Sequence, residues 1–514
     1  MLAAIRSAAV LGIDAYDVTV ETDAANGLPQ FTVVGLPAGA VRESRERVSA
    51  ALVNSGFTLP PRRLTVNLAP ADVRKEGTAF DLPIALGILV ATGQLPADRV
   101  AKLIVAGELG LDGSIRAIRG VLPMARIAAR AADRPVFIVP PSNAAEAALV
   151  GGARLSAPAT LGELVAAIRR DALPEFVAVP TPLMPDAELL DLADVAGQES
   201  AKRALEVAAA GGHNLLLVGP PGSGKTMLAR RLAGILPSLT EDERLEATAI
   251  HSVAGTLAGG VLAARPFRAP HHSVSSAGLV GGGSAPRPGE VSLAHHGVLF
   301  LDELLEFPRS VLDALRQPLE EGRVIIARAS ASIAFPARFT LVGAMNPCPC
   351  GYSGDPTHGC VCATADIARY RSRLSGPLAD RIDMHVTVGA VPIPLLRARG
   401  GESSSAIRPR VERARVAQRV RYAKLRGVAC NAHVPGRWLD AHGEMTAAAR
   451  SLLIAAANRL ALSARGYHRV LKIGRTIADL DDERAIDEPQ VAEALRYRPT
   501  PATASPLHAV AAGR

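Results

Sequence analysis

The feature that most constrains the fold of this 514-residue chain is a glycine-rich turn between an apolar run and an amphipathic stretch. Residues 215–218 read LLLV, and residues 219–226 read GPPGSGKT. Four consecutive apolar residues predict a strand buried on both faces, which is typical of a parallel sheet covered by helices. Glycines let the following backbone curl so that its N–H groups surround an anion, and the next helix adds partial positive charge. The segment therefore predicts an α/β domain with a phosphate-binding loop, residues 219–226.

The side chains of the phosphate-binding loop indicate which phosphate-containing ligand the loop binds. Lys225 is spaced to reach the outer phosphates of a nucleoside triphosphate, and the Thr226 hydroxyl is spaced to ligate Mg²⁺. ATP and Mg²⁺ are therefore the predicted cofactors. The rest of the loop is predicted to enclose the phosphates with its backbone: Gly219, Pro220, Pro221, Gly222, Ser223 and Gly224.

Two further strand-like runs end in polar side chains. Residues 298–301 read VLFL and lead into Asp302 and Glu303. Ligands of open α/β sheets bind at the carboxyl ends of the strands, so we predict that Asp302 holds Mg²⁺ through water. Glu303 is predicted to orient or deprotonate the attacking water. Asn346 follows the apolar run at residues 339–344. Its amide either holds the same water molecule or forms a turn before Pro347, and the local sequence does not distinguish these two roles.

The whole chain divides into five segments. Residues 1–172 alternate strand-like and helical runs, as in a compact α/β domain, and residues 173–187 form a proline-rich linker. Residues 188–395 alternate buried strands with helices, which predicts a parallel sheet. Residues 396–498 are predicted to be helical throughout, and the tail at 499–514 is predicted to be disordered.

Composition excludes several classes of protein. Hydrophobic residues make up 48% and charged residues 21% of the chain, which excludes a disordered or collagen-like protein. The most apolar uncharged run, residues 82–97, is too short and too rich in proline and glycine to span a membrane. We read the apolar start of the chain as folded structure rather than a targeting segment, and we expect a cytoplasmic protein.

Positive charge is concentrated in one stretch. The chain carries a formal charge of +8, and residues 397–426 hold ten Arg and Lys side chains against two Glu. A cluster of this kind suits a polyanion such as DNA, although a solvated connecting helix has the same composition. Aromatic residues make up only 3%, which argues against a series of base-stacking side chains.

Four of the five cysteines lie within fifteen residues. Cys348 and Cys350 form one Cys-x-Cys pair, and Cys360 and Cys362 form another. Four soft ligands separated by glycine and proline suit a closed, tetrahedral, structural Zn²⁺ site. His358 is an alternative ligand, and free thiols or disulfides are alternative states. The fifth cysteine is predicted to be inert.

Three long motifs resemble a known family. They are VVGLPAGAVRESRERV at 33–48, NPCPCGYSGDPTHGCVC at 346–362 and RYRSRLSGPLADRID at 369–383. Together with the phosphate-binding loop they resemble the magnesium-chelatase-like AAA+ ATPases, and within them the ComM (YifB) proteins, over residues 1–498. The resemblance implies a ring-forming homo-oligomer, a hexamer, that moves on single-stranded and branched DNA. It also implies branch migration, in which the joint between incoming DNA and the chromosome is extended during natural transformation.

The resemblance also implies roles for individual residues. Gly197 and Gln198 would border the adenine pocket. Arg381 would be an arginine finger that reaches the ATP of a neighbouring subunit, unless it forms an ion pair with a flanking aspartate. Arg465 would be a second sensor in the helical region, with Arg469 as the alternative.

Two insertions distinguish this branch of the family. One covers residues 254–290, and the other is a predicted hairpin with strands at 324–328 and 333–335. In related ring motors such insertions line the central pore. The candidates for DNA phosphate contacts are therefore Arg265, Arg268, Arg287 and Arg328, with a structural role as the alternative for Arg268.

The first 172 residues resemble the Lon-type protease domain, which acts through a Ser–Lys pair. Aligning the motifs puts Ala79, or another residue that is not serine, at the serine position and Leu122 near the lysine position. Without a nucleophile and a base, acyl transfer is excluded, so we predict a non-proteolytic domain that assists assembly or DNA binding. The alternatives for the whole chain are a magnesium-chelatase-type motor subunit, a protein remodeller and a nucleotide-gated scaffold.

Overall fold

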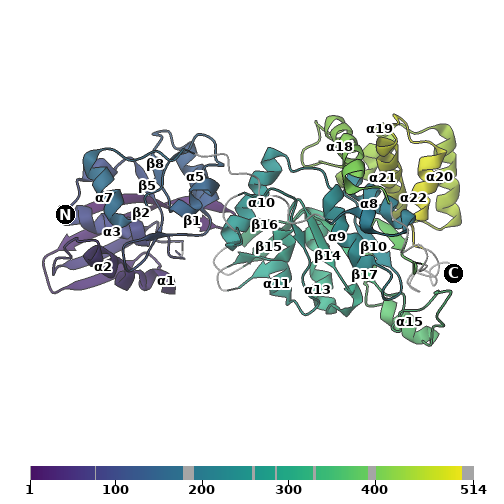
Figure 1. The fold of residues 1–514 in the computed structure, drawn as a ribbon, viewed down its shortest axis with the longest axis horizontal. Helices are drawn as coiled ribbons and strands as arrows, with labels where there is room; N and C mark the ends of the chain where they lie inside the picture. Colours follow the sequence, from purple (N-terminus) through teal and green to yellow (C-terminus); the bar gives the residue numbers. More distant parts are fainter. Residues whose placement is uncertain are drawn as a thin grey trace.

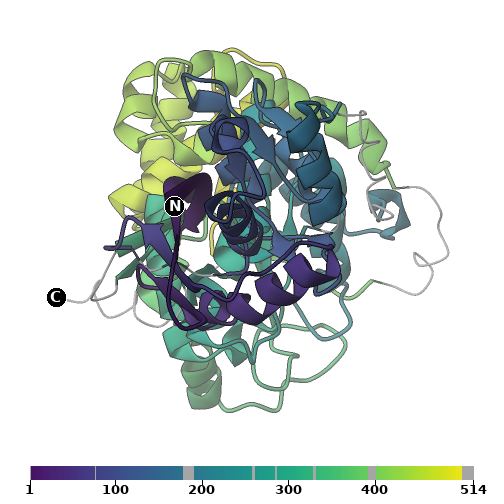
Figure 2. The same cartoon turned by 90° about the vertical axis from the view of Figure 1, so that its left-hand side faces the viewer.

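The computed structural model describes residues 2–73, 75, 77–177, 190–257, 261–283, 286–327, 332–391 and 401–499. Arg328, most of the predicted linker and the predicted tail lie outside these ranges. The described chain has an N-terminal lobe at one end, a central sheet, and a group of helices at the other end (Figure 1). Figure 2 looks along the long axis, with the N-terminal lobe in front and the C-terminal helices behind it.

The N-terminal lobe is built on a seven-stranded mixed sheet with the order β3-β4-β2-β1-β5-β8-β9. The β1 strand pairs antiparallel with β2 along its whole length and parallel with β5. The strands are β1 (Leu2–Leu11), β2 (Asp14–Ala25), β3 (Gln30–Val34), β4 (Arg63–Ala69), β5 (Leu103–Val105), β8 (Val136–Ile138) and β9 (Arg154–Ser156), with a small β6–β7 pair at Glu108–Leu109 and Ile115–Arg116. The helices are α1 (Gly39–Arg42), α2 (Ser44–Asn54), α3 (Asp81–Ala91), α4 (Ala97–Val100), α5 (Val121–Arg130), α6 (Pro141–Ala147) and α7 (Leu161–Arg170).

The long apolar run of the sequence is explained by α3. All eleven residues of this helix are buried, because it packs against β1 and β2 in the core of the lobe. A helix that is apolar on every side is expected in such a position. In the described part of the chain, no helix combines the length and the apolar character that crossing a bilayer requires.

The central region contains the parallel sheet that the sequence predicts. Its five strands have the order β11-β14-β17-β10-β18, and every pair is parallel. The strands are β10 (Leu215–Val218), β11 (Phe267–Arg268), β14 (Val298–Leu301), β17 (Thr340–Met345) and β18 (Met384–Thr387). The helices are α8 (Glu199–Gly211), α9 (Lys225–Ile235), α10 (Glu241–Ala254), α11 (Ser276–Val280), α12 (Glu290–Leu293), α13 (Arg309–Ala314), α14 (Arg316–Glu321), α15 (Thr364–Arg371) and α16 (Gly376–Ala379).

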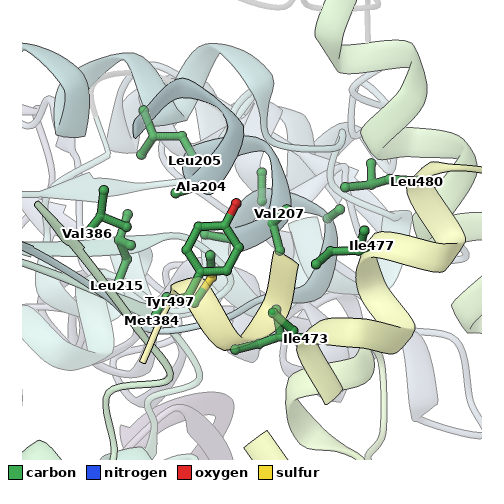
Figure 3. Packing of buried hydrophobic residues seen from close by; sticks show 14 of the residues in the cluster. Ala204, Leu205, Val207, Leu215, Met384, Val386, Ile473, Ile477, Leu480 and Tyr497 are labelled. Atoms are coloured by element: carbon green, nitrogen blue, oxygen red, sulfur yellow. The ribbon is translucent and has the colours of Figure 1, made fainter. Parts of the chain in front are cut away.

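The C-terminal region is helical, as predicted. Its helices are α18 (Ser404–Arg421), α19 (Gly436–His442), α20 (Ala447–Arg459), α21 (Ala464–Leu480) and α22 (Glu488–Arg496). They share one core with the sheet: Tyr497 lies among Leu215 of β10, Met384 of β18 and Ile473 of α21 (Figure 3). The Tyr497 carbonyl also accepts a 2.8 Å hydrogen bond from the backbone N–H of His385, so it covers the free edge of β18.

Two small hairpins belong to the central region, and the one at residues 323–336 faces the N-terminal lobe (Figure 1). The predicted hairpin is present as β15 (Arg323–Ala327) and β16 (Ser332–Pro336), paired antiparallel, and β12 (Gly281–Gly282) pairs with β13 (Arg287–Pro288). The turn at Gly12 packs against β16, where an added Cβ would lie 2.9 Å from Ile333 Cγ2. The Gly120 N–H also donates to the Ser252 carbonyl of α10 at 3.1 Å, so the lobe contacts the central region in two places.

Candidate functional site

The predicted nucleotide residues lie together at the carboxyl edge of the five-stranded sheet. Parallel pairing aligns β10, β14 and β17 so that all three strands end at this edge. The phosphate-binding loop follows β10, the acidic pair follows β14, and Asn346 follows β17. Three segments that are far apart in the sequence therefore form one site.

Lys225 occupies the centre of this site. Its Nζ donates to the carbonyls of Gly219 and Pro220, each at 2.8 Å, and to Asn346 Oδ1 at 3.2 Å. Burial lowers the pKa of Lys225, and the carboxylates of Asp302 and Glu303 oppose that shift. The structure thus brings the Asn346 amide to the lysine, a contact that the local sequence left undecided. The carbonyl oxygens of Gly219 and Pro220 thus occupy hydrogen-bond positions on the Lys225 ammonium group that phosphate oxygens would take.

Thr226 and Asp302 form the predicted metal-binding pair. The Thr226 hydroxyl donates to Asp302 Oδ2 at 2.7 Å, across 76 positions of sequence. Gly224 has a φ of +90°, which allows the loop to turn directly into α9. One hydroxyl and one carboxylate at a helix N-terminus are the donor set that Mg²⁺ and a triphosphate require, so these residues fit the two predicted cofactors.

Glu303 adopts a strained backbone conformation. Its φ is +50°, its N–H donates to Asp302 Oδ1 at 3.0 Å, and its side chain is 61% exposed. His272 Nδ1 lies 3.7 Å from Glu303 Oε2, because β11 runs parallel to β14 and leads His272 to the same edge. No role was predicted for His272, and the pair of adjacent histidines at 271–272 was the only signal for it in the sequence.

Gln198 connects the start of α8 to the phosphate-binding loop. Gly197 and Gln198 both have positive φ values, +60° and +58°. The Gln198 amide donates to the Gly389 carbonyl at 2.6 Å and to the Ser223 carbonyl at 3.3 Å. This segment therefore lies beside the loop, as a border of the adenine pocket should.

Arg381 lies at the opposite edge of the same sheet. It precedes β18, and its carbonyl accepts from Asn214 Nδ2 at 2.8 Å just before β10 begins. The length of β10 therefore separates Arg381 from the phosphate-binding loop of its own chain. Arg381 forms an ion pair with Glu320 of α14, rather than with either of the two flanking aspartates considered above.

Arginines gather around a cavity of about 520 Å³ at this amino edge. Arg381, Arg465 and Arg469 all line it, and the phosphate-binding loop contributes no residue to it. Burial, followed by the charges of Arg465 and Arg469, lowers the pKa of Arg381. This cavity, which we call the arginine cavity, is thus lined by several cations in one place.

The two arginines of α21 have different environments. Arg469 is 10% exposed and donates to the Asp380 and Ile382 carbonyls at 2.6 and 3.2 Å. Arg465 is 63% exposed, and only a 3.9 Å approach to Asp380 engages it in the described chain. Arg469 therefore positions the Arg381 segment, whereas Arg465 remains available to a ligand.

Arg265 has a structural role that the sequence did not reveal. Its side chain is only 13% exposed. It donates to the carbonyls of Pro237, Ser238 and His296 and to the Glu243 carboxylate, at 2.6–3.2 Å. An arginine has five N–H groups, so four are already used. The prediction of a DNA contact at Arg265 has no support in this environment.

The other predicted DNA contacts differ from one another. Arg268 forms a two-pronged ion pair with Glu290 at 2.7 and 2.9 Å, which agrees with the structural alternative. Arg287 is exposed on β13 and has no ion-pair partner among the residues that the structure describes. Arg328 lies outside the described ranges.

The Arg-rich stretch around α18 also divides into two groups. Arg410 and Arg421 form ion pairs within the fold, with Glu206 and Asp479 respectively. Four basic side chains are exposed and unpaired in the described chain: Arg413, Arg419, Lys424 and Arg426. Part of the charge therefore holds the helix in place, and part remains free for an external anion.

The four clustered cysteines bring their sulfur atoms together. Cys348 Sγ lies 3.3 Å from Cys350 Sγ and 3.6 Å from Cys360 Sγ, and all four sulfurs lie within 4.8 Å of one another. A tetrahedral zinc ion with ~2.3 Å Zn–S bonds separates its sulfurs by about 3.8 Å. The cysteines are free thiols, which excludes the disulfide alternative in this structure, and the set could hold a metal ion. His358 lies outside this sulfur cluster, and Cys430 is buried elsewhere.

The sequence matches family profiles of magnesium chelatase subunit ChlI along most of its length. The profile described as magnesium chelatase, subunit ChlI, matches residues 191–394. A second ChlI profile matches residues 20–143, and the ChlI C-terminal profile matches residues 401–498.

Relatives that match nearly the whole chain narrow this assignment. The competence protein ComM of Haemophilus influenzae is 47% identical over 97% of both chains. The YifB protein of Escherichia coli is 42% identical, also over 97% of both chains. A magnesium-chelatase 67 kDa subunit of Chlorobaculum parvum is 31% identical over 31% of this chain and 24% of its own. By its sequence, and with the nucleotide residues gathered at one edge of its sheet, this chain belongs to the ComM/YifB family of magnesium-chelatase-like AAA+ ATPases.

Proposed function

We propose that this chain is the subunit of a hexameric, ATP-driven DNA motor that migrates branched joints when incoming DNA is integrated. The observation that carries the proposal is the division of the nucleotide residues between two edges of one sheet. A ring supplies the missing half, because each arginine cavity would face the phosphate-binding loop of the next subunit. The named role of the ComM relative as a competence protein supports the link to DNA uptake.

The residues of the carboxyl edge would perform the ATPase reaction. Bound ATP·Mg²⁺ would supply the phosphoryl group and neutralise part of its charge. Lys225 would exchange its carbonyl partners for phosphate oxygens, Thr226 and Asp302 would hold the metal, and Glu303 would orient the attacking water. Arg381 of the next subunit would stabilise the charge of the transition state.

DNA contacts would come from the exposed basic side chains. Arg287 lies on one of the two hairpins, and Arg413, Arg419, Lys424 and Arg426 are exposed around the end of α18. Such unpaired cations release counterions when they meet phosphates, so the affinity depends on salt. Arg287→Glu should weaken binding to single-stranded DNA and reduce the slope of log K against log salt. Arg130→Glu, an exposed charge reversal in the N-terminal lobe, is the matched control.

We further propose that the N-terminal lobe, residues 1–172, is a non-proteolytic Lon-like domain joined by the linker to the ATPase core at 188–395 and the helical lid at 396–498. Ala79 and Leu122 are both buried aliphatic residues, so neither supplies a nucleophile or a base. Casein incubated with the protein and ATP should remain intact. Release of peptides would overturn this part of the proposal.

The four cysteines would hold one structural Zn²⁺ ion. Sulfur separations of 3.3 and 3.6 Å are near the tetrahedral edge expected for zinc. The purified protein should contain about one zinc per chain, and the Cys350→Ser/Cys360→Ser variant should contain none.

The decisive experiment is ATP hydrolysis without DNA, with single-stranded DNA and with a four-way junction, alongside Lys225→Ala. Stimulation by DNA that disappears in the variant would support the motor. Hydrolysis that is indifferent to every DNA form would instead favour the second candidate, a chelatase-type motor or remodeller that acts on a protein. The partial similarity to a magnesium-chelatase subunit is the observation behind that candidate.

A further inference from the structure

The four-cysteine loop, residues 348–362, contacts the phosphate-binding loop directly. Gly351 has a φ of +91° and packs against Pro221, so that an added Cβ would lie 2.5 Å from Pro221 Cδ. Contacts this short are not tolerated by ordinary packing, so only glycine fits here. Pro221 is itself exposed on its other sides. The four-cysteine loop therefore packs against the phosphate-binding loop and supports its conformation.

The four-cysteine loop is also connected to Lys225, because Asn346 lies just before the loop in the sequence. Asn346, which accepts a hydrogen bond from Lys225, lies two residues before Cys348. The carbonyl of the intervening Pro347 accepts a 3.0 Å hydrogen bond from Arg371 Nε of α15. The start of the four-cysteine loop thus sets the position of Asn346.

The other end of the loop leads to the acidic side of the site. Cys362 lies two residues before α15, and Arg373, just beyond that helix, donates to the Leu305 carbonyl at 3.1 Å. Leu305 follows Glu303 in the turn after β14. The two cysteine pairs therefore belong to two arms, one attached to the lysine and the other to the acidic strand.

Apart from the hydrogen bond from Arg371 to the Pro347 carbonyl, the contacts that join the two arms in the described chain are mostly made by the sulfur atoms. Cys350 N–H donates to Cys362 Sγ at 3.4 Å, and Ser353 N–H donates to Cys348 Sγ at 3.3 Å. Most other side chains of the loop are exposed or half-exposed, so no apolar core holds the loop together.

We propose that zinc bound by the four cysteines controls the affinity of the phosphate-binding loop for nucleotide. The ion joins the two arms, and the joined loop holds Pro221 and Asn346 in place. Without the ion the arms separate, and the phosphate-binding loop loses its support. This inference rests on the proposed ATP and zinc sites, and it adds that the two sites are thermodynamically coupled.

The first test uses the full-length wild-type protein in the absence of DNA. Zinc is removed with a chelator, and the dissociation constant of a fluorescent ATP analogue is measured before removal, after removal and after adding Zn²⁺ back. Removal should weaken binding by about 5- to 100-fold, the range typical of coupling between two sites, and Zn²⁺ should restore it. Reciprocity requires that the nucleotide tighten zinc binding by the same factor. Unchanged affinity after complete removal would overturn the proposal.

The second test leaves the sulfur atoms in place. Gly351→Ala should keep its zinc but weaken nucleotide binding, because the new methyl group displaces Pro221. Gly354→Ala is the matched control: Gly354 has a φ of +83°, but an added Cβ would meet nothing within 4 Å. The two variants therefore carry the same kind of backbone strain, and only one reaches the phosphate-binding loop. Equal nucleotide affinities for the two variants would refute the contact as the route of coupling.

The readouts separate failure of this inference from failure of the proposed function. All measurements omit DNA, so a protein that DNA does not stimulate can still show the coupling. If the zinc-loaded protein binds the ATP analogue no better than Lys225→Ala does, the nucleotide site itself is wrong, and the coupling is refuted with it. A purified protein without zinc that binds nucleotide fully would refute the coupling alone.

Discussion

The two edges of the five-stranded sheet carry the same kinds of charged side chain in opposite balance. At the carboxyl edge, Lys225 lies among carbonyls, an amide and two carboxylates, and both Lys225 and Thr226 have hydrogen-bond partners within their own chain. At the amino edge, Arg381, Arg465 and Arg469 line one cavity, and Arg381 Nε is buried without a hydrogen-bond partner in the described chain. One edge is complete enough to receive a nucleotide, and the other has cations to spare.

The difference indicates how a single chain divides its work. Arg381 is paired with Glu320 in the single chain, but its buried Nε has no hydrogen-bond partner among the described residues, so a further acceptor supplied by something else would satisfy it. In the proposed ring, that acceptor would be the triphosphate on the carboxyl edge of the neighbour. The following experiments test this division, and they are ordered by the size of the expected effect.

The largest effect should come from removing the lysine of the carboxyl edge. Lys225→Ala removes the only ammonium group that contacts this loop in the described chain, so ATP binding and hydrolysis should both fall by about 10³-fold or more. Lys102→Ala, an exposed lysine of the N-terminal lobe, should match wild type in a steady-state phosphate-release assay. A Lys225→Ala protein that retains activity would show that the carboxyl edge is not the nucleotide site.

Arg381→Ala should abolish turnover but spare nucleotide binding. A loss of about 10³-fold in kcat is expected for an arginine that acts on the transition state from a neighbouring subunit. Mixing Arg381→Ala chains with Lys225→Ala chains should recover about a quarter of the wild-type rate, if the chains mix at random and interfaces act independently. A mixture as inactive as either variant alone would show that Arg381 acts within its own chain.

Glu303→Gln should separate binding from chemistry at the carboxyl edge. The amide keeps the shape of the side chain but cannot accept the proton of water, so kcat should fall by about 10²-fold. ATP should remain bound and hold the subunits together, which size-exclusion chromatography with ATP would detect. Hydrolysis at the wild-type rate would exclude Glu303 as the base.

The two lid arginines should respond differently. Arg465→Ala should lower kcat about tenfold without changing the melting temperature, because Arg465 is exposed and makes no strong contact. Arg469→Ala should instead destabilise the fold by about 2 kcal/mol, because three hydrogen bonds to the Arg381 segment are lost. If the two variants changed kcat and the melting temperature by the same amounts, Arg465 and Arg469 would not have the different roles described here.

The amino edge should also show a modest dependence on pH. His295, three residues before β14 begins, is buried, and burial lowers its pKa to about 4. The unfolded chain binds this proton first as the pH falls, so stability is full above about 6.5 and is lost between there and about 4. Unfolding free energy should fall by about 2 kcal/mol from pH 7 to pH 5 through this group. His295→Gln should flatten that part of the profile, and an unaltered profile would contradict the assignment.

The carboxyl edge could be predicted because each of its motifs is local. The phosphate-binding loop and Asp302–Glu303 each follow an apolar run whose end the sequence marks clearly. Asn346 was ambiguous, since its contact with Lys225 spans 121 positions and depends on β10 pairing with β17. The sequence of neither strand alone predicts that β10 and β17 pair in parallel.

The amino edge could be predicted only in part. The resemblance pointed to Arg381 and to the lid arginines, but the cavity that joins them depends on how α21 packs against the sheet. Arg265 was misjudged because charge alone does not distinguish a phosphate ligand from a buried donor to carbonyls. The first strand was also not identified as such, because the pairing that defines β1 is with β2 and β5.

The hydrogen bond from His385 to Tyr497 has a consequence for the order in which the molecule is made. The strand that closes the nucleotide-binding sheet is covered by nearly the last described residues, and β10 packs in the same core. At about 5–20 residues per second on the ribosome, the free edge of β18 waits on the order of 5–20 s for its final cover. A chain released early would lack that cover and expose an open strand edge, a form that quality-control proteases and chaperones recognise. A covered edge on the nucleotide-binding sheet is thereby reached only in chains that have been synthesised as far as Tyr497.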